Sequence, residues 1–174
     1  MSPKIKTYLK LFLYFGIPFA TGMALWDYFD GEVFSLSGFL FQSIFFGLFM
    51  SLAIGSWHFS VMDEKGIDSS LESNQKLKQE TSIISSIPKE ALLEKLKSHS
   101  KSKRFKLKDG ENNILLRTKA NMEGWGEKIE IIFKEKTPDG QYLTIKSRPI
   151  FRFALVDYGR NVANINWIQG IIEG

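Results

Sequence analysis

A dense group of basic side chains lies in the second half of the chain and is the first candidate for binding chemistry. Four of its members are candidate anion ligands: Lys103, Arg104, Lys106 and Lys108. In a strand, Arg104, Lys106 and Lys108 share one face, because successive side chains alternate. Cations close to a bilayer attract anionic lipid headgroups. The alternative is a solvated face that keeps the domain soluble. Nucleic acid is disfavoured, because Phe105 is the one aromatic residue of the FWY type within the run.

A second group of cations, Arg148, Arg152 and Arg160, surrounds a predicted helix start at Asp157. Backbone N–H groups at a helix N-terminus, together with arginine side chains, can bind an anion. We favour a structural interpretation, in which Asp157 caps the helix, Gly159 permits a tight turn and the arginines pair locally. A hydrolase or transferase at the Arg148/Asp157 corner would need a further base, which the spacing does not reveal.

The remaining candidates are weaker. Trp125 lies between two glycines, which is typical of a bulge that displays an aromatic platform, but ordinary packing of Trp125 is the favoured interpretation. His58 and His99 have no companion ligands at metal spacing, and the chain has no cysteine. We therefore expect no metal and no cofactor, and the sequence favours a binding protein over an enzyme.

Two long apolar runs, 8–26 and 36–61, must position these groups relative to a membrane. A helix needs roughly 20 residues to cross a bilayer core of about 30 Å. The first run is close to that length and the second is longer. The sequence predicts a two-helix transmembrane hairpin over residues 1–62. In the alternative, the first run is a cleaved signal peptide, with Gly22 and Ala24 before the cut.

Charge around the two runs predicts their orientation. Lys4, Lys6 and Lys10 precede the first run and Lys65 follows the second, whereas the connection between the runs carries acidic residues and no Lys or Arg. Positively charged flanks stay on the cytoplasmic side, so we expect both termini to be cytoplasmic.

Small residues recur at every fourth position in both runs: Gly16, Ala20 and Ala24 in the first, Gly47, Ser51 and Gly55 in the second. Such faces let two helix backbones approach closely in lipid. The favoured partner of each face is the other helix of the hairpin. The alternative is association into a homo-oligomer or a larger membrane complex.

The rest of the chain reads as a polar linker over 63–82 and one α+β domain over 83–174. Helical spacing predicts a helix over 88–98, and Asp157 begins a second helix. Alternating patterns and turn residues between them predict four strands, over 104–108, 113–119, 127–136 and 141–148. The expected order is α-β-β-β-β-α, a four-stranded antiparallel meander flanked by the two helices.

One segment near the C-terminus resembles a domain family of unknown function found in bacterial and plastid proteins. A strand ending in Ser and Arg leads there to an Asp-x-Gly-x-Asn helix start; the matching residues are Ser147, Arg148, Asp157, Gly159 and Asn161. This chain departs from the pattern at Pro149, which replaces a second Ser-Arg element. The resemblance implies an α+β domain and a shared structural or binding corner, and it implies no reaction.

Together these patterns predict an integral protein of a bacterial cytoplasmic membrane that presents a small basic domain to the cytoplasm. We expect a non-enzymatic binding or scaffold module whose partner is anionic lipid or another membrane protein. The second hypothesis is an accessory subunit that binds a larger complex through its transmembrane helices, and the third is an enzyme at the Arg148/Asp157 corner. No nucleic-acid partner is expected.

Overall fold

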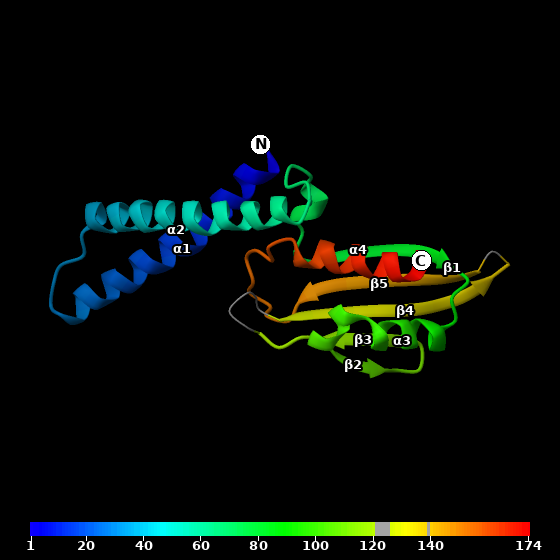
Figure 1. Cartoon of the computed structure of the whole chain (residues 1–174). Coiled ribbons are helices and arrows are strands. Elements are labelled where there is room, and N and C mark those ends of the chain that lie inside the picture. Colours follow the sequence, from blue (N-terminus) through cyan, green and yellow to red (C-terminus); the bar gives the residue numbers. More distant parts are fainter. Residues whose placement is uncertain (121–125, 139) are drawn as a thin grey trace. The chain divides into compact units, whose positions relative to one another are not determined.

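In the computed structural model the chain forms two compact units, Met1–Glu72 and Ser73–Gly174 (Figure 1). The structure describes residues 1–120, 126–138 and 140–174. Each unit has its own interior and is described by itself.

The first unit is a pair of long helices, α1 (Pro3–Phe29) and α2 (Leu36–Glu64). The Ser2 hydroxyl accepts the Ile5 N–H at the start of α1, and the Ser35 hydroxyl accepts the Gly38 N–H at the start of α2. Both helices are long and apolar enough to cross a membrane. They extend beyond the predicted spans 8–26 and 36–61 because the polar flanks continue the same helical turns.

The second unit is built on a five-stranded antiparallel sheet in the order β1-β5-β4-β3-β2. Its strands are β1 (Gln79–Ser85), β2 (Lys106–Asp109), β3 (Asn113–Arg117), β4 (Glu127–Thr137) and β5 (Gly140–Pro149). The α+β class and the meander from β2 to β5 are confirmed. β4 and β5 pair as the predicted hairpin up to Thr137 and Gly140, and Asp139 of the predicted turn lies outside the described residues.

The fifth strand is the main difference from prediction. The sequence predicts a polar linker at residues 79–82, yet they form the first half of β1, which pairs with β5 from Gln79 to Ser85. A short helical turn, η1 (Glu72–Gln75), precedes it. β1 is an edge strand with alternating half-buried and exposed residues, so its sequence carries few apolar side chains and resembles a linker.

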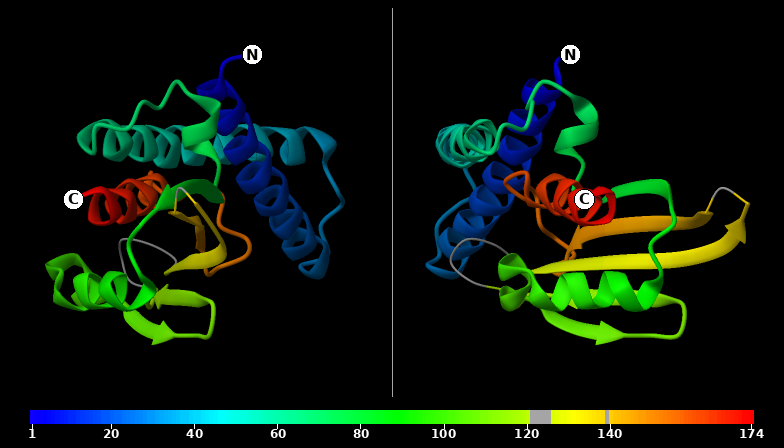
Figure 2. Two further views of the ribbon diagram at one scale, coloured as in Figure 1. Left: turned by 90° about the vertical axis from the view of Figure 1, so that its right-hand side faces the viewer. Right: turned by 45° about the vertical axis from the view of Figure 1, so that its right-hand side comes forward.

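Two helices, α3 (Lys89–Ser98) and α4 (Arg160–Glu173), cover one face of the sheet (Figure 2). They enclose a single apolar core with the strands, and its fully buried members are Leu92, Leu96, Ile114, Leu116, Ile129, Ile131, Leu143, Ile145 and Ile168. Both helices agree with the predicted apolar spacing. α4 begins three residues after Asp157 because Tyr158 and Gly159 adopt left-handed backbone angles before the first turn.

The basic run also folds differently from prediction. Arg104 was expected in a strand, on one face with Lys106 and Lys108, but it ends the helical turn η2 (Ser100–Arg104), and β2 begins only at Lys106. The Phe105 ring is buried between these two elements. The chain bends at Phe105, which belongs to the apolar core, and Arg104 therefore lies outside the strand that carries Lys106 and Lys108.

Candidate functional site

A hollow of about 380 Å³ lies at the end of the sheet where β3 ends and β4 begins. The cationic side chains that line it are Lys103, Arg104, Lys106, Arg117, Lys119 and Arg160. We call this site the basic hollow. Its lining comes from η2, β2, β3 and α4, so residues far apart in sequence meet there.

Strand register brings these cations together. Lys106 at the start of β2 is the cross-strand partner of Arg117 at the end of β3, and Arg117 is in turn paired with Lys128 on β4. Like charges on directly opposite strand positions repel one another. The Lys106–Arg117 pair therefore has a cost in stability that a bound anion would relieve.

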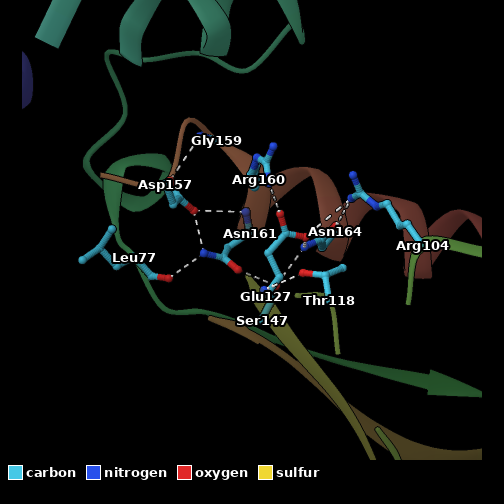
Figure 3. A network of polar contacts seen from close by, with 10 residues as sticks. All are labelled: Leu77, Arg104, Thr118, Glu127, Ser147, Asp157, Gly159, Arg160, Asn161 and Asn164. Atoms are coloured by element: carbon cyan, nitrogen blue, oxygen red, sulfur yellow. Dashed lines mark hydrogen bonds and ion pairs between the residues drawn. The ribbon is translucent and has the colours of Figure 1, made fainter. Parts of the chain in front are cut away.

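A buried carboxylate, Glu127, lines the hollow. Figure 3 shows its polar contacts with Arg104, Arg160 and Asn164. Arg160 Nη1 donates to Glu127 Oε1 at 2.9 Å, and Asn164 Nδ2 donates to Oε2 at 2.9 Å. Arg104 Nη2 lies 3.5 Å from the same Oε2. A buried charge requires such partners, because water no longer solvates it. Glu127 therefore holds both arginines at the wall of the hollow.

The hollow carries a net positive charge among the residues that the structure describes. One carboxylate, that of Glu127, faces the six cationic side chains that line it. Arg104 is held less tightly than Arg160, because its side chain is 44% exposed, against 15% for Arg160. Arg104 also donates to Asn164 Oδ1 at 3.4 Å, but its greater exposure leaves it more accessible to an incoming anion than Arg160.

A second polar network adjoins Glu127 at the start of α4. Asn161 Nδ2 donates to Asp157 Oδ2 at 2.7 Å and to the Leu77 carbonyl at 2.9 Å. The Ser147 hydroxyl donates to Asn161 Oδ1 at 2.7 Å and accepts from Asn164 Nδ2 at 3.3 Å. Asn161 therefore connects β5, the segment before β1 and the start of α4.

The Asp157 carboxylate helps to build this corner. Its Oδ1 accepts the Gly159 N–H and its Oδ2 accepts the Asn161 N–H in the first turn of α4, although the N-cap residue is Gly159 and not Asp157 as predicted. Burial raises the pKa of the Tyr158 hydroxyl, although the Arg160 charge opposes this effect. The adjoining cavity measures about 10 Å³, which is room for roughly one water molecule. This geometry gives no support to a reaction at the corner.

The predicted site residues divide between these places. Lys103, Arg104, Lys106 and Arg160 line the basic hollow. Lys108 lies further along β2, and Arg148 and Arg152 are exposed outside the hollow. Of the residues in the resemblance, Ser147, Asp157, Gly159 and Asn161 join the polar network, whereas no contact within that network involves Arg148 among the described residues.

Sequence reasoning missed three charged residues of the hollow: Arg117, Lys119 and Glu127. The basic side chains at 117 and 119 alternate at the end of a predicted strand, which was a usable signal. Their proximity to Arg104 depends on strand register, however. The burial of Glu127 had no sequence signal, because a carboxylate at the first residue of a strand is ordinarily exposed.

In the first unit, the small-residue faces pack against each other. A Cβ on Gly16 would lie 2.4 Å from the Ser43 carbonyl oxygen, and one on Gly47 would lie 3.1 Å from the Gly16 Cα. Gly16, Ala20, Gly47, Ser51 and Gly55 are buried, and Ala24 is half-buried. These contacts correspond to the favoured interpretation, in which each face serves the hairpin itself.

The other candidates contribute little to a site. Trp125 lies outside the described residues. His99 Nδ1 accepts the Lys101 N–H at 3.1 Å, and its ring packs on Trp167. His58 is buried in the helical hairpin. Within residues 1–120, 126–138 and 140–174, no group of three or more His, Cys, Asp or Glu side chains could hold a metal ion.

Comparison of the chain with known protein families, with curated protein sequences and with solved structures gives no match. The basic hollow is consequently interpreted from its own geometry.

Proposed function

We propose that this protein is a membrane-anchored binding module whose second unit recognises anionic, phosphate-bearing lipid headgroups through the basic hollow. The observation that carries the proposal is the convergence of six cationic side chains on one hollow of about 380 Å³. Arginine and lysine are the residues that bind phosphate oxygens, arginine through two parallel N–H groups and lysine as a point charge.

The two long helices supply the location. α1 and α2 anchor the protein in the bilayer, with both termini on the cytoplasmic side because the lysines flank the outer ends of the helices. The chain from Glu64 to Gln79 spans at most about 50 Å when fully extended. This covalent limit keeps the hollow within reach of the headgroups of the same membrane.

The chemistry of the site favours binding over catalysis. Glu127 accepts from Arg160 and Asn164, so its carboxylate is already engaged. The hydroxyl of Thr118 accepts the Glu127 N–H at 2.8 Å and thereby helps to hold the strand end in place. These groups make a pre-arranged cationic wall, which suits recognition of a fixed charge.

Titration of the full chain with water-soluble short-chain lipids tests the proposal. In neutral detergent micelles, we expect short-chain phosphatidylglycerol to bind with an affinity that falls as salt rises, because exposed charges are screened. Short-chain phosphatidylcholine should not bind. Inorganic phosphate separates recognition of the phosphate group alone from recognition of a lipid headgroup.

A matched pair of variants locates the binding. The hollow variant combines Arg104→Gln, Lys106→Gln and Arg117→Gln, and the control variant combines Lys97→Gln, Lys134→Gln and Lys136→Gln at exposed positions elsewhere in the same unit. With about 1 kcal/mol per cation, the hollow variant should lose roughly 100-fold in affinity. Equal losses in the two variants would mean that net charge, and not the hollow, attracts the lipid.

A further inference from the structure

A short loop between β5 and α4 exposes three large apolar side chains. Ile150 is 42% exposed, Phe151 43% and Phe153 75%. The two phenylalanine rings lie 5.8 Å apart, edge to face. The exposed Arg152 stands between them in sequence. We call residues 150–153 the aromatic loop; it combines apolar tips with positive charge.

The aromatic loop and the basic hollow lie at the same end of the sheet. Pro149, immediately before the loop, is the cross-strand partner of Glu127, which lines the hollow. The Ile150 N–H donates to the Gly126 carbonyl at 3.0 Å. A Cβ on Gly126 would lie only 3.1 Å from the Ala120 nitrogen, in the wall of the hollow. Figure 2 shows the connection from β5 to α4 at this end of the sheet.

We propose that the aromatic loop inserts into the lipid surface and thereby places the basic hollow at the level of the headgroups. Phenylalanine side chains prefer the boundary between headgroups and acyl chains, and neighbouring arginines extend their charged ends toward lipid phosphates. The inference rests on the proposed function for the identity of the surface, since the hollow provides the headgroup contact.

The chemistry of the loop favours lipid as its partner. Arg148 and Arg152 are exposed cations that flank the apolar side chains, which complements an anionic bilayer. In the proposed anchored protein, the two candidate spans of the same chain keep the loop near a membrane. An isolated exposed phenylalanine needs no explanation, but three large apolar side chains on one loop beside six cations do.

The absence of cysteine from the chain makes a direct test straightforward. We would introduce a single cysteine by Phe153→Cys and attach an environment-sensitive fluorophore. The control is Glu135→Cys, an exposed position toward the opposite end of the sheet. Each full-length protein is reconstituted into vesicles of phosphatidylcholine and phosphatidylglycerol that contain a lipid with a quencher high on its acyl chain.

We expect the label at position 153 to shift to shorter wavelength and to be quenched roughly threefold or more above the label at 135, because its environment becomes apolar. Equal quenching at the two positions would overturn the proposal. A shift at 153 without quenching by lipid would also overturn it, because that result identifies a protein surface as the partner.

The headgroup titration separates this inference from the proposed function. Binding of short-chain phosphatidylglycerol without lipid quenching at 153 would leave the hollow as a headgroup site and reject insertion of the loop. Lipid quenching at 153 without headgroup binding would support insertion and reject the role of the hollow.

Discussion

The two units of this protein distribute large and small side chains in opposite ways. In the helical hairpin the buried positions include Gly16, Gly47 and Ser51, whereas Phe41 and Phe45 are 70% and 65% exposed. In the second unit, the apolar core is built mainly from large side chains, chiefly leucines and isoleucines. This difference is the one expected if the hairpin is built for lipid and the second unit for water.

The physical reason lies in what drives packing in each environment. In water, burial of apolar surface stabilises a core, so large aliphatic side chains are inside. In lipid, large apolar side chains gain little from burial, and close approach of helix backbones through small residues holds helices together. The arrangement in α1 and α2 is the second kind, which supports the proposed membrane location.

The largest expected effect is the loss of stability when a core side chain of the second unit is truncated. Ile131→Ala removes a fully buried side chain and should lower the free energy of unfolding by about 2–5 kcal/mol. Ile132→Ala, at the next position on the opposite face, should cost about 1 kcal/mol or less. Urea unfolding of the full chain in micelles, followed by hydrogen exchange of β4 and β5, measures both. Similar losses would mean that the two faces are equally important.

An intermediate effect is expected when a small residue between α1 and α2 is replaced by a large one. Gly47→Ile places a Cβ 2.8 Å from the Phe12 carbonyl oxygen, so the helices must separate; overpacking of this kind costs about 1–3 kcal/mol. Gly22→Ile is the matched control, because a Cβ there has no neighbour within 4 Å among the described residues.

Spin labels on cysteines introduced at Leu13 and Phe49, two exposed positions, report the separation of α1 and α2. We expect the distance to increase in Gly47→Ile and to stay the same in Gly22→Ile. An unchanged distance in both variants would contradict the close packing of the helices.

The smallest expected effect is a pH dependence of stability that belongs to the second unit and not to the hairpin. Partial burial raises the pKa of Glu130, but the nearby Lys128, Asn113 and Lys146 lower it more, so the net pKa lies below its usual value of 4.5. A depressed folded-state pKa stabilises the protein above the unfolded pKa, and this contribution disappears as pH falls through the folded pKa.

Glu130→Gln should therefore weaken the loss of stability of the second unit below about pH 4.5. The change in the free energy of unfolding should be less than about 1 kcal/mol, because the Lys128–Glu130 ion pair is partly exposed. The spin-label distance in the hairpin should not respond over the same pH range. Identical acid profiles for Glu130→Gln and the unmodified protein would rule out this contribution.

Much of the architecture could be predicted from local patterns. The two long helices, α3, α4 and the strands from β2 to β5 all have strong periodicity or turn residues, and they were found within a few residues of their true ends. β1 was missed because an edge strand needs few apolar residues. Arg104 was misplaced because the turn at Phe105 depends on burial of its ring against other elements.

The candidate site was predicted only in part. Clusters of charge in the sequence identified Lys103, Arg104, Lys106 and Arg160, but equally suggested Lys108, Arg148 and Arg152, which lie elsewhere. The density of charge along the sequence cannot tell the cations inside the hollow from those outside it. Neighbouring cations on a strand share a face in both cases, and only the fold determines which of them meet cations from other elements.

The sequence by itself determined the apolar spans, the small-residue faces and the elements of an α+β domain, because each depends on the identity and spacing of neighbouring residues. Only the tertiary structure decided that Lys106 meets Arg117, that Glu127 is buried beneath Arg160, and that the aromatic loop shares an end of the sheet with the hollow. Those contacts depend on strand register and on packing between distant segments, which local patterns do not encode.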